Sequence, residues 1–171
     1  MIKDIILVDE DDQETGSESK LIVHQRALRH RAFSVFVFKK NEGQLELLLQ
    51  QRHSDKYHCG GLWTNTCCGH PRPGEEVAAA GMRRLFEETG LKLDLQHKGV
   101  FHYIAKFDNG LTENEVDHVL VGWYSGEFIH PDPHEIATLN WLSVVAIQQE
   151  LIEKPEQYTP WFAQALIIAC Q

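Results

Sequence analysis

Residues 64–91 read TNTCCGHPRPGEEVAAAGMRRLFEETGL and decide the interpretation of the chain. The first part places the thiol of Cys68 close to the imidazole of His70, in a segment that its prolines and glycines keep irregular. The second part has helical spacing and is followed by Gly90, in the position where glycine commonly ends a helix. The stretch therefore predicts a loop that carries a thiol and leads into a helix over Glu76–Thr89.

This helix has two predicted faces. At 3.6 residues per turn, one face holds small and apolar side chains, at Val77, Ala78, Gly81, Met82 and Leu85. The adjoining polar arc carries two arginines and two glutamates, at Arg83, Arg84, Glu87 and Glu88. We expect the first set to face the core and the carboxylates of the second set to point into one site.

The same stretch resembles the Nudix box, G-x5-E-x7-R-E-U-x-E-E-x-G-U, in which U is a bulky aliphatic residue. Eight fixed positions fall in register: Gly69, Glu75, Arg83, Leu85, Glu87, Glu88, Gly90 and Leu91. Arg84 is the exception, since it stands where the box carries a glutamate. Matches at this spacing favour a functional site over a solvated helix face with Arg–Glu pairs. Clustered carboxylates bind a hard cation such as Mg²⁺, which in turn bridges phosphate oxygens.

The composition places limits on the rest of the chain. A length of 171 residues suggests one domain over residues 1–171, with its core at about 20–168. The net charge of −9 argues against nucleic acid or an anionic membrane as the main partner. No apolar run is long enough to span a bilayer, and acidic residues follow the short apolar start at once. We therefore expect a cytoplasmic protein without a signal peptide.

The remaining elements follow from hydrophobic periodicity and turn residues. Strands are expected at Asp4–Val8, Arg31–Lys39, Leu45–Gln51, Val100–Phe107, Glu115–Tyr124 and Leu139–Leu142, and further helices at Ser143–Glu153 and Pro160–Cys170. The acidic segment 9–20 is expected to be a loop, and residues 41–43 form the turn of a hairpin. Strands and helices mixed in this way favour an α+β fold, with a mixed β-sheet sandwiched between helices.

Cys68 allows two interpretations. The chain has four cysteines and no expected secretion signal, so we expect reduced thiols. Most cysteines are small buried hydrophobic residues, and the CCGHP run could be only a tight turn. A thiol beside a metal-binding helix could instead donate a proton or act as a nucleophile. Neither this choice nor the role of His70 is settled by spacing alone.

Two further sets of residues are candidates for ligand binding. Glu113 and Glu115 face the same side of a strand, where they repel each other unless a cation or proton lies between them. They could be surface carboxylates; combined with His24, His30 and His70 they would form a site for Zn²⁺, Mn²⁺ or Mg²⁺. The cations Lys20, Arg52, Lys56 and Arg84 would form a phosphate-binding patch if one cleft gathered them, and are otherwise solvated side chains.

With these residues considered, the sequence resembles the type 1 isopentenyl-diphosphate isomerases of the Nudix superfamily. The resemblance extends from about Lys20 to Trp161 and rests on HRAFSVF, GLWTNTCCGHP, TENEV and TPW. It implies that Cys68 is the acid/base cysteine, that Glu115 acts on the opposite face of the substrate, and that Tyr103 and Trp161 line the carbon pocket. It also implies a divalent ion on His24, His30, His70, Glu113 and Glu115, a Mg²⁺ that arrives with the diphosphate and binds Glu88, and a diphosphate held by Lys20, Arg52, Lys56 and Arg84.

The implied activity is a 1,3-allylic proton transfer of isoprenoid biosynthesis, which interconverts isopentenyl and dimethylallyl diphosphate. The competing hypotheses are a Nudix hydrolase of a nucleoside diphosphate derivative and a non-enzymatic binding module. Arg84 argues against hydrolysis, because replacing a metal-gathering glutamate by a cation weakens water activation and strengthens the hold on a diphosphate. The expected partner is a small diphosphate, and we expect a monomer, with a dimer as the alternative.

Overall fold

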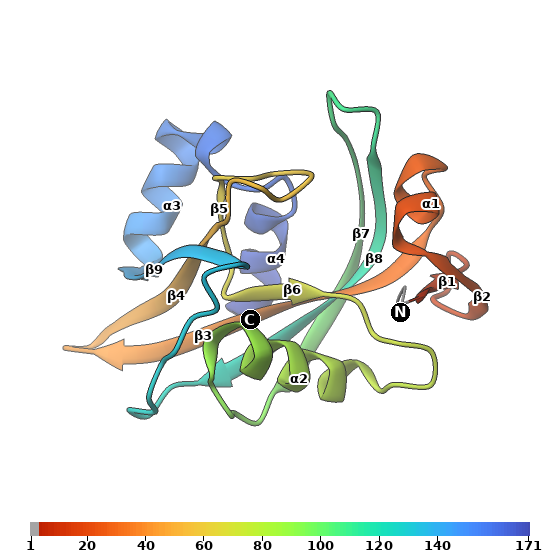
Figure 1. The fold of residues 1–171 in the computed structure, drawn as a ribbon. Helices are drawn as coiled ribbons and strands as arrows, with labels where there is room; N and C mark the ends of the chain where they lie inside the picture. The colour runs from red at the N-terminus through yellow and green to blue at the C-terminus, as the bar shows by residue number, and fades with distance from the viewer. Residues whose placement is uncertain (1–3) are drawn as a thin grey trace.

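The computed structural model describes residues 4–171, so residues 1–3 of the expected domain lie outside the described range. Within it, nine strands form one mixed sheet, with helices on both sides (Figure 1). The strands are β1 Asp4–Val8, β2 Glu14–Ser19, β3 His30–Asn41, β4 Gln44–Arg52, β5 Trp63–Thr64, β6 Cys67–Gly69, β7 Gln96–Lys106, β8 Thr112–Trp123 and β9 Ile136–Ser143. The α-helices are α1 Lys20–Gln25, α2 Val77–Thr89, α3 Val144–Glu153 and α4 Phe162–Ala169, and a short 3-10 helix spans Pro155–Gln157.

Strand β3 is the centre of the sheet. It forms an antiparallel hairpin with β4, and on its other side it pairs in parallel with β8, where His30 lies opposite Glu115. The short strand β6 also pairs with β3, which places Cys68 opposite Ser34. Strands β7 and β8 form a second antiparallel hairpin. Parallel and antiparallel pairs in one sheet confirm the predicted α+β class.

On each face of the sheet, a hydrophobic cluster packs the helices against the strands. On one side, α2 covers the sheet (Figure 1). There Leu85 packs in a cluster with Val35 and Leu120. On the other side, α3 and α4 cover the sheet, and the ring of Phe162 stacks on Phe36 at 6.1 Å between centroids. The sandwich predicted from the sequence is therefore present. Within residues 4–171, no helix is long and apolar enough to cross a membrane.

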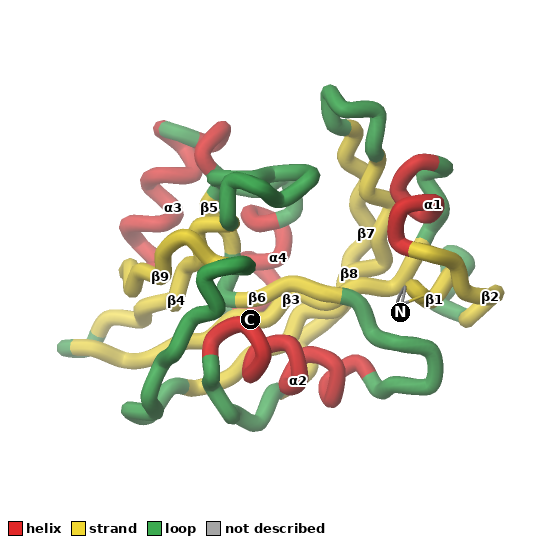
Figure 2. Tube along the Cα trace, viewed as in Figure 1, coloured by secondary structure: helices red, strands yellow, loops and turns green. Residues whose placement is uncertain are grey.

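Several local predictions are confirmed by the backbone. Glu42 and Gly43 both have positive φ, 49° and 80°, as a tight hairpin turn between twisted strands requires. Helix α2 ends at Gly90, whose φ of 76° lies in the left-handed region where glycine carries no Cβ penalty. Ser143 caps α3, because its side chain accepts a hydrogen bond from the amide of Ala146. Each strand predicted from the sequence overlaps a strand of the structure (Figure 2).

The prediction for the acidic segment was wrong, and two short strands were not predicted. Residues 9–20 are not one loop, since β2 occupies Glu14–Ser19 and α1 begins at Lys20. The side chains of β2 are mostly exposed and polar, so its pairing with β1 depends on backbone hydrogen bonds. For this reason the segment has no hydrophobic alternation from which a strand could be predicted. The short strands β5 and β6 were also missed for lack of length.

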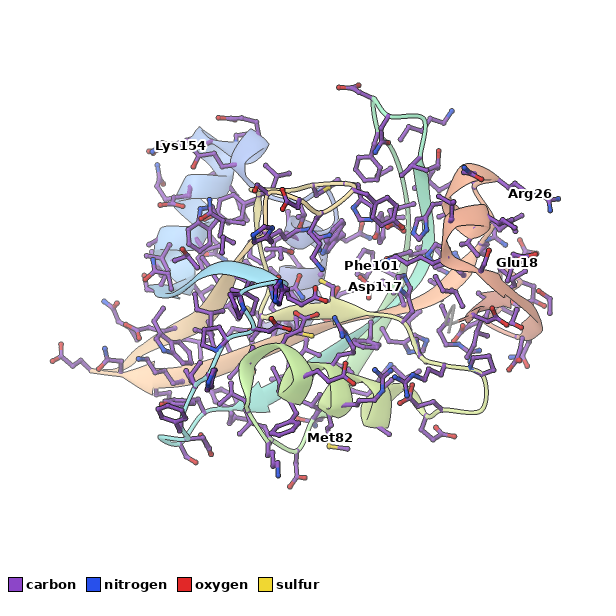
Figure 3. The ribbon with its side chains drawn as sticks, in the orientation of Figure 1. Glu18, Arg26, Met82, Phe101, Asp117 and Lys154 are labelled. Carbon is purple, nitrogen blue, oxygen red and sulfur yellow. The ribbon has the colours of Figure 1, made fainter. Side chains whose placement is uncertain are left out.

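The buried face of α2 is displaced from the predicted one. Ala80, Gly81, Leu85 and Glu88 are buried, whereas Met82 is 38% exposed and points away from the sheet (Figure 3). The close approach occurs at Gly81, where a Cβ atom would collide with Leu120. Because the helix touches the sheet there, its buried stripe follows residues 81, 85 and 88 and leaves Met82 at its edge.

Candidate active site

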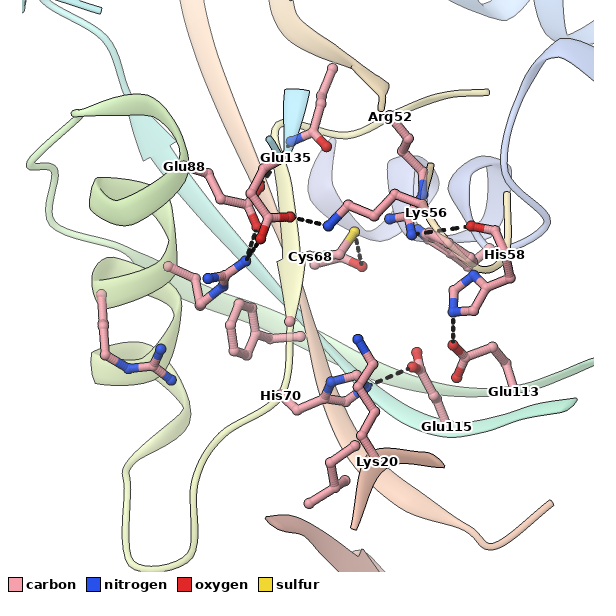
Figure 4. A pocket seen from close by; sticks show the side chains of 18 of the residues that line it. Lys20, Arg52, Lys56, His58, Cys68, His70, Glu88, Glu113, Glu115 and Glu135 are labelled. Atoms are coloured by element: carbon pink, nitrogen blue, oxygen red, sulfur yellow. Dashed lines mark hydrogen bonds and ion pairs between the residues drawn. The ribbon is translucent and has the colours of Figure 1, made fainter. Parts of the chain in front are cut away.

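A cavity of about 280 Å³ opens between the sheet and the loops before β5 and β9. The predicted residues that line it are Lys20, Arg52, Lys56, Cys68, His70, Arg84, Glu88, Tyr103, Glu113, Glu115 and Trp161. The close-up shows cations and carboxylates around the Cys68 side chain (Figure 4). Residues from distant parts of the sequence therefore meet in one polar cavity, and their catalytic and binding roles are predictions.

A group of five His and Glu side chains lies at one end of this cavity. Ligand atoms of His24, His30, His70, Glu113 and Glu115 all fall within 4.8 Å of one another. The β3–β8 pairing brings His30 beside Glu115, and strand alternation puts Glu113 on the same face. His24 comes from α1 and His70 follows β6. The grouping suggested by the sequence is thus present in space.

The geometry of this His/Glu group suits a metal ion. His30 Nε2 lies 3.3 Å from one oxygen of each glutamate, and His24 Nε2 lies 3.0 Å from Glu113 Oε1. The other ring nitrogens, Nδ1 of His24 and of His30, lie 2.6 and 2.9 Å from the backbone carbonyls of Lys20 and Leu28. Donation from Nδ1–H to those carbonyls leaves Nε2 as the free ligand atom, as in many metal sites.

The buried polar atoms and the charges of the His/Glu group also favour a metal ion. His30 Nε2 and Glu113 Oε2 are buried without a hydrogen-bond partner, which is unusual for polar atoms in a folded protein. Burial lowers the pKa of His30, but the neighbouring Glu113 and Glu115 carboxylates outweigh this effect and raise the pKa to about 10. Burial lowers the pKa of His70 to about 4. The carboxylates therefore draw positive charge into the cluster, and a divalent ion on this N/O donor set would supply it.

The sequence interpretation missed His58 beside this cluster. Its Nε2 atom lies 2.7 Å from Glu113 Oε1, and its ring stacks on Phe107 with the planes 2° apart. His58 belongs to the irregular loop between β4 and β5, where no periodicity or motif spacing singles it out. It contacts Glu113 Oε1, whereas His30 approaches the other oxygen of the same carboxylate.

The Cys68 thiol sits in a polar environment at the middle of the cavity. Its Sγ atom lies 3.9 Å from Ser34 Oγ, receives a hydrogen bond from Asn65 Nδ2 at 3.2 Å, and lies 3.4 Å from Asn65 Oδ1. Burial raises the pKa of the Cys68 thiol to about 12, and the neighbouring Asp117 carboxyl adds to the shift. At neutral pH the thiol keeps its proton and can act as an acid.

Tyr103 and Trp161 form the apolar wall of the cavity. Tyr103 donates a hydrogen bond from its hydroxyl to Glu115, and its ring lies 5.9 Å from that of Trp161. The indole nitrogen of Trp161 donates to Asn65 Oδ1 at 3.2 Å, which fixes the ring. The Arg52 guanidinium lies 5.7 Å from the same ring. Polar contacts therefore hold both aromatic rings where they line the cavity.

The α2 end of the cavity differs in part from the prediction. Arg84 and Glu88 line it, and Gln50 donates to Glu88 Oε2 at 3.0 Å. Glu87 does not, because it lies on the exposed side of α2 and pairs with Arg84 Nη1 at 2.7 Å. Only one of the paired glutamates therefore points into the site. A further carboxylate that the sequence interpretation missed, Glu135 in the loop before β9, joins Glu88 there.

Comparisons with known proteins agree with this architecture. The NUDIX domain model matches residues 28–162, so the chain belongs to the Nudix superfamily. A protein from Serratia proteamaculans is 47% identical over 92% of this chain and 86% of its own, and one from Aromatoleum aromaticum is 44% identical over 98% and 93%. Both are named isopentenyl-diphosphate Delta-isomerase, and the chain belongs to that family.

Solved structures support the fold independently. A crystal structure from Deinococcus radiodurans superposes with a TM-score of 0.72 at 20% identity and covers 97% of both chains. The structure of a MutT NUDIX hydrolase from Burkholderia pseudomallei gives a TM-score of 0.61 at 21% identity and covers 81% of this chain and 95% of its own. At this identity the similarity concerns the fold alone, and it confirms the predicted Nudix architecture.

Proposed function

We propose that this protein interconverts isopentenyl diphosphate and dimethylallyl diphosphate by a 1,3-allylic proton transfer, as a step of isoprenoid biosynthesis. The observation that carries the proposal is that Cys68 and Glu115 line the same cavity. The Cys68 thiol is protonated, and the Glu115 carboxyl group accepts a hydrogen bond from Tyr103. The names of the relatives support it as well. An acid and a base in one small cavity match the requirement for moving a proton between two carbons.

The reaction balances on these two groups. The Cys68 S–H bond breaks, and its proton forms a C–H bond at the terminal carbon of the alkene with the electrons of the double bond. A tertiary cation results at the neighbouring carbon. Glu115 then takes a proton from the carbon next to the diphosphate-bearing one, and the electrons of that C–H bond form the new double bond. The thiolate must regain a proton, and Glu115 must lose one, before the next turnover.

The His/Glu group supports the base. We propose that His24, His30, His70, Glu113 and Glu115 hold Mg²⁺, Mn²⁺ or Zn²⁺, since their ligand atoms lie within 4.8 Å of one another and two of these buried residues, His30 and Glu113, have an atom without a hydrogen bond. When bound, such an ion supplies positive charge that fixes the Glu115 carboxyl group and tunes its basicity. Tyr103 positions the same carboxyl group through its hydrogen bond.

The wall of the cavity suits a cationic intermediate. Trp161 and Tyr103 line the same cavity as Cys68, with their ring centroids 5.9 Å apart. A desolvated cation over an indole ring gains about 2 kcal/mol. Trp161 is 4% exposed, so its wall also keeps water from the cation, which water would otherwise trap as an alcohol.

The cations of the cavity provide the diphosphate subsite. Lys20, Arg52, Lys56 and Arg84 line one cavity in a protein with a net charge of −9, so they concentrate positive charge where an anion must bind. We propose that Glu88 holds a Mg²⁺ that arrives with the diphosphate. Because one chain builds the whole cavity, we propose a single-domain monomer as the acting unit, and the reduced thiol that the reaction needs supports a cytoplasmic location.

The proposal is tested by incubating the protein with isopentenyl diphosphate and Mg²⁺ in D₂O. Proton exchange at Cys68 and Glu115 should deliver deuterium to carbon, so mass spectrometry should detect deuterated dimethylallyl diphosphate. Release of phosphate or pyrophosphate without this product would overturn the proposal and favour a hydrolase.

A further inference from the structure

Glu135 lies among the cations of the diphosphate subsite, and the reaction proposed above gives it no role. Its Oε2 atom pairs with Lys56 Nζ, and its Oε1 atom lies 3.3 Å from a guanidinium nitrogen of Arg84 (Figure 4). The same Arg84 nitrogen donates to Glu88. Glu135 is therefore a second carboxylate, besides Glu88, that pairs with the cations needed to bind the substrate's diphosphate.

The backbone holds Glu135 in this place. Its carbonyl accepts a hydrogen bond from the amide of His53 at 3.2 Å, which ties it to the loop that carries Lys56. Its own amide donates to the carbonyl of Asp132 at 3.1 Å, and the amide of Asp132 donates to the carbonyl of Glu88 at 2.8 Å. The position of residue 135 thus depends on main-chain contacts, and an isosteric side-chain change would leave them intact.

The charges around Glu135 are close to balanced in the free protein. Its side chain is 26% exposed, and contacts with Lys56 and Arg84 outweigh the effect of burial and lower its pKa. Burial raises the pKa of Glu88, Arg84 opposes this effect, and the charge of Glu135 adds to the rise. In this subsite, Lys56 and Arg84 are already paired with the carboxylates of Glu135 and Glu88. A metal-free diphosphate that enters must therefore compete with two carboxylates for these cations.

We infer that Glu135 is a specificity-determining residue of the diphosphate subsite: it holds Lys56 and Arg84 in the free protein and, with Glu88, selects a Mg²⁺-complexed diphosphate over a metal-free one. The inference rests on the proposed function, because it concerns the same subsite. A bare diphosphate is repelled by both carboxylates and must displace Glu135 from its cations. A diphosphate that carries Mg²⁺ brings the positive charge that carboxylate oxygens bind, so the same two groups favour it.

The test measures binding of inorganic pyrophosphate by calorimetry, with and without Mg²⁺, for the wild type, Glu135→Gln and Glu87→Gln. Glu87→Gln is the matched control, because Glu87 also pairs with Arg84 but does not line the cavity. We expect Glu135→Gln to bind metal-free pyrophosphate about tenfold more tightly than the wild type. Its affinity for the Mg²⁺ complex should change far less, and Glu87→Gln should behave like the wild type.

Two results would overturn the inference. In one, Glu135→Gln binds metal-free pyrophosphate no more tightly than the control. In the other, it loses affinity equally with and without Mg²⁺, which would make Glu135 a group that only positions the cations. Turnover of isopentenyl diphosphate by the same wild-type preparation tests the proposed function separately, since a functional isomerase can give either binding result.

Discussion

Arg84 and Glu88 form an ion pair across one turn of α2, with a guanidinium nitrogen of Arg84 donating to Glu88 Oε1. This contact joins the one departure from the Nudix box to the one paired glutamate that lines the cavity. With a glutamate at position 84, the helix would present another carboxylate for gathering metal and activating water. With arginine there, it presents a cation beside a single carboxylate. The local chemistry therefore favours holding a diphosphate over cleaving it.

Replacing this cation should weaken substrate binding more than the chemical step. We expect Arg84→Gln to raise the KM for isopentenyl diphosphate about tenfold or more, because a charged hydrogen-bond donor is lost and Glu88 remains buried beside the anion. Steady-state kinetics would measure the effect. Arg31→Gln is the control, since Arg31 pairs with Asp12 at 2.8 Å, does not line the cavity and should affect KM little. Equal effects of the two substitutions would contradict the assignment.

Substitutions of the two adjacent cysteines should have different effects, one on turnover and the other on stability. Cys68→Ala should lower kcat by about 10³-fold or more with the fold intact, because it removes the general acid. Glu115→Gln should be equally damaging, since it removes the base. Cys67 is fully buried in the cluster beneath α2, so Cys67→Ala should lower the unfolding temperature and retain turnover. Circular dichroism and isomerase assays on all three variants check this, and near wild-type turnover by Cys68→Ala would refute the mechanism.

Features encoded within one element were predictable from the sequence. Helix α2, its stop at Gly90, and the shared face of Glu113 and Glu115 on β8 depend on local periodicity. The same alternation extends to Asp117, whose Oδ2 accepts a hydrogen bond from Ser34 at 2.7 Å. Asp117 is therefore a further residue of this face that strand alternation predicts.

Features that depend on tertiary packing were not predictable in this way. His58 and Glu135 are single polar residues in irregular loops, and nothing in their spacing brings them to Glu113 or Arg84. The segment before Lys20 was interpreted as loop because β2 is stabilised by backbone pairing with β1. The five residues of the His/Glu group span positions 24–115 and have no common spacing, so the sequence left surface carboxylates as an alternative and the family resemblance favoured the group.

The Nudix-box residue Glu75 should stabilise the fold in a pH-dependent way. It accepts two hydrogen bonds from Arg83, at 2.7 and 2.9 Å, and one from the amide of Arg72, and these contacts tie the loop to α2. The hydrogen bond from Arg83 lowers the pKa of Glu75 and outweighs the effect of burial. A lowered folded-state pKa means that this stability is present above the unfolded pKa of about 4.3 and is lost as pH falls through the folded value.

Glu75→Gln should therefore lower the free energy of unfolding by about 1 kcal/mol at pH 7, the upper end for a partly exposed ion pair. Below both pKa values, wild type and variant should have the same stability. Urea denaturation across this pH range measures the difference. A difference that persists unchanged at low pH would show that the effect comes from side-chain packing instead of charge.

Removing divalent ions should destabilise the His/Glu group. Without an ion, Glu113 and Glu115 place two carboxyl groups against three imidazoles, and His30 Nε2 and Glu113 Oε2 are buried without a hydrogen bond. An ion at about 100 times its dissociation constant adds about 2.7 kcal/mol of stability, which corresponds to a rise of about 5–10 °C in Tm for a domain of this size. Thermal unfolding after EDTA treatment, followed by addition of Zn²⁺, Mn²⁺ or Mg²⁺, would show this shift and rank the ions.

The matched variant for this experiment is Glu113→Gln. Glu113 meets His24, His30 and His58 in the fold, so its neutral isostere keeps the shape of the cluster and removes the charge that a divalent ion needs. We expect its Tm to be insensitive to both EDTA and added metal. Because Glu88 lies at the other end of the cavity, Glu88→Gln should keep the full metal response in the absence of diphosphate. An equal metal response in Glu113→Gln and the wild type would place the structural ion elsewhere.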